Sequence, residues 1–300
     1  MEDHASSPEL LPTAEIRQVP ALHGLLWLQR GFRLFAAQPL RWMQLLSLWL
    51  GLALVMPLML TVALENVRKA ILIALNPLNL DESVASLLGI LPMLPPLAMV
   101  LLFPLVFAGL MVGCATVAHG GRLQPRHLFA ALRVEPSRLV TVGGINAVGQ
   151  ILMSQAIAWL IHDRVGDLDF NIPSGPHAAQ AMAEQLDRLQ AVTPLVLPVL
   201  VLQTLLMAAL WFTPPLLVFH NITPLAAVRL SISGCARNMG ALSVYSLALV
   251  LMLSLVGALA LSASAGIVFA VIALLVLGAA MTTMIASLYV SYCDIFQPHG

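Results

Sequence analysis

Long apolar segments alternate with polar ones along almost the whole chain, and six of them are long enough to cross a membrane. A transmembrane helix needs about 20 mostly apolar residues, because it rises about 1.5 Å per residue across a hydrocarbon core about 30 Å thick. The pattern therefore predicts an all-α fold, a polytopic membrane helical bundle. Its six spans are expected at about 40–63, 91–118, 139–161, 193–219, 240–262 and 266–291.

Two longer polar loops, about 64–90 and 162–192, separate the spans on one side. Within the first loop, residues 70–90 begin with an apolar stretch that Asn76, Pro77 and Asp81 interrupt, and we interpret them as a re-entrant or surface segment. Within the second, Ala178 to Gln190 contains neither glycine nor proline, so we expect a short helix there. Such a helix would cover the outer end of the bundle or dock a partner.

The composition agrees with a membrane protein and excludes several other classes. Of the 300 residues, 60% are hydrophobic and 9% are charged, whereas soluble domains contain about 25% charged residues. The 14 basic residues equal the 14 acidic ones, which leaves no basic excess for binding nucleic acid. The three cysteines are far apart in the sequence, which argues against a disulfide scaffold.

Basic residues are concentrated in the connections on one side of the predicted spans. Membrane proteins carry an excess of Lys and Arg in their cytoplasmic connections. Ten basic residues against four place both chain termini in the cytoplasm, and the opposite loops are net acidic. The ten are Arg17, Arg30, Arg33, Arg41, Arg122, Arg126, Arg133, Arg138, Arg229 and Arg237; the four are Arg68, Lys69, Arg164 and Arg188.

An internal repeat is suggested by three short segments that begin at Pro20, Pro125 and Pro224, each before an odd-numbered span. Each segment is too short to span the membrane and has an apolar and a basic face, so we expect an amphipathic interfacial helix. The predicted organisation is a disordered cytoplasmic tail, 1–18, and one membrane domain, 19–300, with pseudo-repeats at about 19–118, 119–219 and 220–300. The alternative is that any positive-inside protein built of three hairpins shows this pattern.

Several short motifs resemble those of a known family. Gly31-Phe32, Phe35, Pro39 and Trp42 are similar to its opening motif; Pro214 to His220, Ala226-Ala227, Ser231 and Asn238 are similar to its central motif, and Tyr292 to Phe296 are similar to its closing motif. The family is the YciC-like bacterial inner-membrane proteins, distantly similar to the membrane domain of some glycerophosphodiester phosphodiesterases. The resemblance implies six spans in the bacterial inner membrane and brings no catalytic residues with it.

Polar side chains in the third span suggest either packing or a path. Asn146, Gln150 and Ser154 follow one another at four-residue intervals, and Gln203 in the fourth span is a candidate partner. Amides and hydroxyls in hydrocarbon must find partners, and they often join helices. The two interpretations are contacts between helices and a polar path for a substrate.

The arginines near the cytoplasmic side are the candidate lipid-binding residues. Arginine on an interfacial helix attracts anionic headgroups, so these side chains either bind phospholipids specifically or only anchor the protein. They are Arg30, Arg33, Arg41, Arg126, Arg133, Arg138, Arg229 and Arg237.

No catalytic residues, metal site or cofactor are expected, because no nucleophile–base pair or close Cys/His spacing is evident. We therefore expect a non-enzymatic accessory or assembly component that binds membrane phospholipids or a membrane-protein partner, and no nucleic acid. The alternative is a transporter or flippase for a neutral or amphipathic, lipid-like cargo. A polar cavity lined by Asn146, Gln150 and Gln203 would favour transport; an apolar groove or solid packing would favour the accessory role.

Overall fold

The computed structural model describes residues 15–75, 86–133, 136–165, 178–261 and 266–297. The described residues are almost entirely helical and include no strand. In chain order the elements are α1 (His23–Ala37), α2 (Pro39–Leu50), the π-helical turn η1 (Gly51–Val55), α3 (Met56–Leu75), the 3-10 turn η3 (Leu91–Met93), α5 (Leu94–Ala118), the 3-10 helix η4 (Pro125–Arg133), α6 (Pro136–Val165), α7 (Ala178–Trp211), α8 (Thr213–Phe219), α9 (Pro224–Arg237), α10 (Met239–Leu261) and α11 (Ile267–Phe296).

Among the residues that the structure describes, six helical segments are long and apolar enough to cross a membrane, which agrees with the predicted number of spans. The expected boundaries shift by several residues, because helices continue into segments that were expected to be loops. The six are Pro39–Ala74, Ser86–Ala118, Pro136–Trp159, Leu197–Phe219, Met239–Leu261 and Ile267–Phe296.

The first span is longer than predicted, since α2, η1 and α3 form one column of 36 residues from Pro39 to Ala74. Its charges are paired along the helix: Arg68 Nη2 lies 2.6 Å and Lys69 Nζ 3.7 Å from Glu65 Oε1. The expected re-entrant or surface segment at 70–90 is therefore wrong at its start, because residues up to 75 extend α3. Residues 76–85 lie outside the described part of the chain.

The helix expected at Ala178 to Gln190 is present, but it is the start of a longer one. It continues as α7 into the fourth span, Leu197–Phe219, and ends at Trp211, and α8 forms the rest of that span. Two prolines, Pro194 and Pro198, lie inside α7, where each lacks a backbone N–H to donate. The expected short helix at Ala178 to Gln190 is therefore the first part of a longer helix that enters the fourth span.

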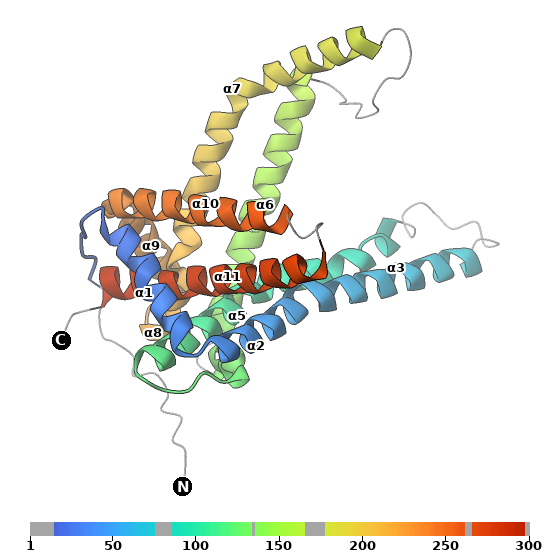
Figure 1. Cartoon of the computed structure of the whole chain (residues 1–300). Coiled ribbons are helices and arrows are strands. Elements are labelled where there is room, and N and C mark those ends of the chain that lie inside the picture. The colour runs from blue at the N-terminus through green and yellow to red at the C-terminus, as the bar shows by residue number, and fades with distance from the viewer. Residues whose placement is uncertain (1–14, 76–85, 134–135, 166–177, 262–265, 298–300) are drawn as a thin grey trace.

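Three helical hairpins leave a shared region and point away from it (Figure 1). They are α2–α3 with α5, α6 with α7, and α10 with α11; the α6–α7 hairpin is directed away from the other two. We call the shared region the convergent end. It comprises α1, η4, α8, α9, the C-terminal halves of α5 and α11, and the first turns of α6 and α10.

Burial is concentrated at the convergent end. In α11 nearly all buried positions follow Gly278, and in α5 nearly all follow Pro104. At the far end of the α10–α11 hairpin, Leu261 is 79% and Ile267 77% exposed. Lipid tails are as apolar as leucine, so these surfaces need no protein cover in a membrane.

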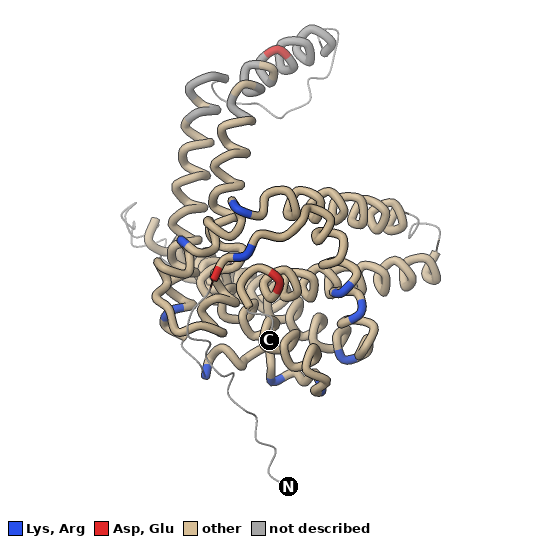
Figure 2. The backbone as a smooth tube through the Cα atoms, turned by 90° about the vertical axis from the view of Figure 1, so that its left-hand side faces the viewer, with Lys and Arg blue, Asp and Glu red and all other residues tan. Residues whose placement is uncertain are grey.

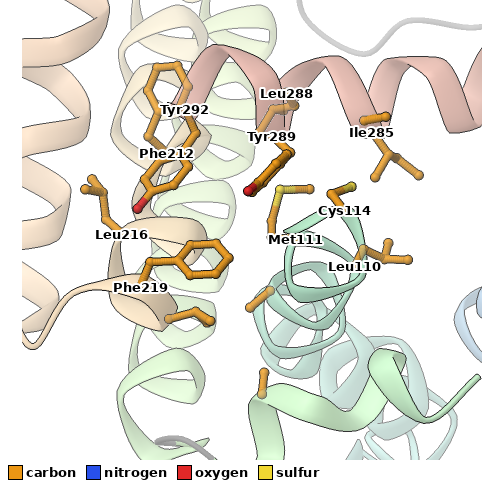
Figure 3. Close-up of a cluster of buried hydrophobic side chains, with 14 of the residues drawn as sticks. Leu110, Met111, Cys114, Phe212, Leu216, Phe219, Ile285, Leu288, Tyr289 and Tyr292 are labelled. Carbon is orange, nitrogen blue, oxygen red and sulfur yellow. The ribbon is translucent and has the colours of Figure 1, made fainter. Parts of the chain in front are cut away.

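Aromatic rings from α8 and α11 fill the centre of the convergent end (Figure 3). The ring centroids of Phe212 and Phe296 lie 5.3 Å apart, and those of Phe219 and Tyr292 lie 5.5 Å apart. Figure 3 shows the ring of Tyr289 beside Met111 of α5. Such ring pairs add about 0.5–1.5 kcal/mol beyond the area that they bury.

Helix α1 packs against α10 and α11 through two glycines. A Cβ on Gly31 would meet the backbone N of Ser287 at 2.7 Å, and one on Gly24 would meet the carbonyl oxygen of Ala241. Between the glycines, Trp27 is fully buried, and its ring lies edge-on to that of Tyr245 with centroids 5.8 Å apart. The absence of two side chains thus lets the backbones approach closely enough to enclose the indole.

The segments expected to be interfacial helices are α1, η4 and α9, and each precedes a span. The second is a 3-10 helix, so the three are not equivalent in geometry, and the internal repeat stays a prediction. The expected tail, 1–18, falls mostly on residues 1–14, outside the described part of the chain. At its end the backbone N–H of Arg17 donates to the carbonyl of Ile295 at 2.9 Å, so the chain is attached to α11 there.

Substituting Gly31→Ala should destabilise the protein, because the methyl group would overlap the Ser287 backbone. We expect a loss of about 1–3 kcal/mol, measured by thermal unfolding of the purified protein in detergent. Gly51→Ala is the control, since a Cβ there meets no atom within 4 Å. Equal melting temperatures for the two variants would contradict the close contact between α1 and α11.

Candidate functional site

Two amide side chains, one buried and one half-buried, connect segments of the convergent end that are far apart in sequence. Asn238, at the junction of α9 and α10, is 2% exposed; its Oδ1 accepts from the backbone N–H of Val19 at 2.9 Å, and its Nδ2 donates to the carbonyl of Arg17 at 2.8 Å. Gln38, between α1 and α2, donates to the carbonyl of Gly121 at 2.7 Å and accepts from the backbone N–H of Leu123 at 2.9 Å. Asn238 thus holds the chain just before α1, and Gln38 holds the chain where α1 ends.

A buried carboxylate connects α1 to the end of α11. Asp294 is 6% exposed, and its Oδ2 lies 2.7 Å from His23 Nδ1 and accepts from Trp27 Nε1 at 2.9 Å. Buried charges need such partners, because losing hydration without compensation is costly. Sequence reasoning assigned no role to this trio; the signal was a carboxylate within an otherwise uncharged last span.

A pocket of about 380 Å³ lies beside this carboxylate, between α1 and the ends of α5 and α11. Arg30 and Arg33, both exposed, line it together with His119. Its other lining residues are Leu34, Ala118, Tyr289, Val290, Cys293, Asp294 and Gln297. We call it the basic pocket.

An apolar groove of about 470 Å³ lies on the other flank of α1, where α1 meets α10 and α11. Leu28, Gln29 and Phe32 of α1 line it. The remaining lining residues are Met252 and Val256 of α10 and Val276, Ala279, Ala280 and Thr283 of α11. We call it the apolar groove.

The arginines predicted to bind lipid gather around the convergent end, as the view onto this end in Figure 2 shows. Arg138 donates to Asn221 Oδ1 at 3.0 Å and to the carbonyl of Ile222 at 3.1 Å, and Arg41 donates to Gln38 Oε1 at 3.3 Å. Both are half-buried. The six exposed ones are Arg30, Arg33, Arg126, Arg133, Arg229 and Arg237.

The basic surface of η4 owes its charge to its arginines. Burial, and to a lesser extent the neighbouring Arg126, lowers the pKa of His127. Its Nδ1 accepts from the backbone N–H of Gln124 at 3.1 Å, which is the bond of a neutral imidazole. His127 therefore adds no charge to this surface at neutral pH.

The polar residues of α6 lie outside both the basic pocket and the apolar groove. Asn146 and Gln150 are half-buried, Ser154 is exposed and donates to the carbonyl of Ile151, and Gln203 of α7 is half-buried. Neither the basic pocket nor the apolar groove includes any of the four. The Oδ1 atom of Asn146 is buried without a hydrogen-bond partner in the described part of the chain.

No group of three metal-ligating side chains occurs among the residues that the structure describes. Cys114 and Cys235 are buried free thiols, and Cys293 is half-buried. They lie among apolar side chains of the convergent end, where cysteine packs as a small hydrophobic residue.

Comparisons with known proteins agree with the membrane architecture. No known family profile and no solved structure matches the chain. A probable inner membrane protein of Burkholderia thailandensis is 26% identical over 168 residues, which cover 54% of this chain and 59% of that protein. The chain is a multi-pass membrane protein. The chain matches less than two thirds of this relative's length. The resemblance to the YciC-like family stays a prediction.

Replacing Asn146 by leucine should leave the protein at least as stable, because it removes a buried oxygen that accepts no hydrogen bond from the described residues. Asn146→Asp should destabilise it by about 1–3 kcal/mol or more, since an unpaired buried group costs that much. Thermal unfolding in detergent measures both. A large loss of stability in Asn146→Leu would mean that water, lipid or a substrate satisfies this atom.

Proposed function

We propose that this chain is a non-enzymatic component of a bacterial inner membrane that binds phospholipids at its convergent end and serves as an accessory or assembly subunit. The observation that carries the proposal is the basic pocket, together with four further exposed arginines on η4 and α9. Asp294, the carboxylate among the pocket's lining residues, already accepts hydrogen bonds from α1. The accessible charge there is therefore positive and suits phosphate groups.

The divergence of the three hairpins supports the accessory role. Long apolar faces of α3, α7 and α10 are exposed, with Leu58, Leu197 and Leu255 between 58% and 73% exposed. Such faces can be covered by lipid or by another membrane protein. A subunit whose own core occupies only one end has most of its surface available for such contacts.

Identification of what stays bound after gentle extraction tests this function. Native mass spectrometry of the protein from its own membrane should show retained phospholipid, with or without a stoichiometric membrane-protein partner. Simultaneous Arg→Gln substitution of Arg126, Arg133, Arg229 and Arg237 should lower lipid retention, since each arginine near an anionic surface contributes about 1 kcal/mol. Retention of neither lipid nor protein by the wild type would contradict the proposal.

The same proposal places both chain termini and the convergent end on the cytoplasmic side, because the exposed arginines lie there. A reporter that is active only in the cytoplasm, fused after Gly300, should be active. The same reporter inserted between residues 76 and 85 should be inactive. The reverse result would place the basic pocket on the outer face and contradict this orientation.

Transport of a neutral or amphipathic cargo is the second candidate. The buried, unpartnered Oδ1 of Asn146 favours it, since such an atom can receive a donor from a passing substrate. Flux of lipid or solute into vesicles containing the purified protein, and its loss in a double Asn146→Leu and Gln150→Leu variant, would support transport over the accessory role.

A further inference from the structure

We propose that the basic pocket and the apolar groove together form one phospholipid site on α1, with the phosphate in the pocket and an acyl chain in the groove. This inference rests on the proposed lipid-binding function and assigns it to one place. Arg30 and Arg33 bind the phosphate group of the lipid. Phe32, Met252 and Val276 contact its acyl chain.

The two hollows are arranged along α11 in the order that a membrane requires. Helix α1 crosses α11 where Gly31 touches Ser287. The groove residues Val276 to Thr283 lie before this crossing, within the span, and the pocket residues Tyr289 to Gln297 lie after it, at the helix end. The polar hollow is therefore at the interface and the apolar one is deeper.

The separation between the hollows along α11 is comparable to the thickness of the headgroup region. Tyr289 is the sixth residue after Thr283, a rise of about 9 Å along a helix. The polar region of each leaflet adds about 5–8 Å beyond the hydrocarbon core. A phosphate at one hollow can thus belong to the same molecule as an acyl chain at the other.

The outer surface of α1 provides a polar connection between the hollows. Gln29 lines the groove and Arg33, one turn later, lines the pocket. Residues four apart on a helix lie on the same face. Both are exposed, so the amide and the guanidinium can follow the ester and phosphate groups of a lipid that passes over α1.

The charge of the pocket selects an anionic group. Two guanidinium groups face one carboxylate, Asp294, whose Oδ2 accepts from His23 and Trp27. Guanidinium groups bind phosphate oxygens in pairs of parallel hydrogen bonds. Inorganic phosphate offers the same oxygens, so the groove decides whether the ligand is a lipid.

Binding to the full-length protein in detergent, followed by native mass spectrometry, tests the site with three probes. Dioleoyl phosphatidylglycerol has a phosphate group and acyl chains, dioleoylglycerol has acyl chains but no phosphate, and inorganic phosphate has no acyl chain. We expect one phosphatidylglycerol to bind more tightly than further copies and more tightly than dioleoylglycerol. A hundredfold excess of phosphate should not displace it.

Two pairs of variants locate the site. Arg30→Gln with Arg33→Gln should weaken the first phosphatidylglycerol about tenfold or more. Lys69→Gln with Arg122→Gln removes the same charge at exposed positions outside the pocket and should change this binding less than about twofold. Val276→Trp fills the groove and should weaken binding similarly. Leu274→Trp, at an exposed position of α11 outside the groove, is its control. Unchanged melting temperatures establish that the variants are folded.

The outcomes separate this inference from the proposed function. Equal losses in the Arg30/Arg33 pair and in the Lys69/Arg122 pair, or an unaffected Val276→Trp variant, would overturn the shared site while leaving general lipid binding intact. Displacement by inorganic phosphate would assign the pocket to a free anion and would also overturn the shared site. Failure of the wild type to prefer phosphatidylglycerol over dioleoylglycerol would overturn both the site and the proposed function.

Discussion

The contact between α1 and α11 is the constraint on which the rest of the convergent end depends. Gly31 lets the two backbones touch, and this proximity buries Trp27 and brings its indole N–H to Asp294. A carboxylate at the end of a span is costly unless it receives such donors. The basic pocket and the apolar groove exist because α1 lies in this place, since each hollow is bounded by one of its flanks.

In a membrane, the helices of such a protein need to pack against one another at only one end, because lipid covers the rest. In water, hairpins that diverge would expose large apolar surfaces, and the hydrophobic effect would close them. In lipid there is no such force between helices, so association depends on close packing and polar contacts. These contacts are present at the convergent end: aromatic pairs around Tyr292, the amides of Gln38 and Asn238, and the glycines of α1. They are sparse among the described residues toward the far ends of the hairpins.

Apolar segment length was enough to predict the helical class and the six spans, because lipid solvation imposes that length directly. The extent of α3 and α7 was underestimated, since paired charges such as Glu65 and Arg68 allow a helix to continue through polar positions. The basic pocket was predicted only in part: Arg30 and Arg33 were named, but Asp294, His119 and Tyr289 were not associated with them. Their meeting depends on how α1 crosses α11, which no local pattern encodes. The expected polar stripe of α6 lies outside the basic pocket and the apolar groove, and its role stays a prediction.

The contacts that hold α1 in place join residues separated by more than 200 positions, including Val19 with Asn238, His23 with Asp294 and Arg17 with Ile295. Contacts so distant in sequence form late, because the intervening chain must be in place first. During synthesis α1 emerges before every span, whereas its partners α10 and α11 are made last. The first helix must therefore wait at the membrane surface until the final hairpin is inserted, so a ribosome that stalls before α10 would leave a chain with its spans in the bilayer and its core unassembled.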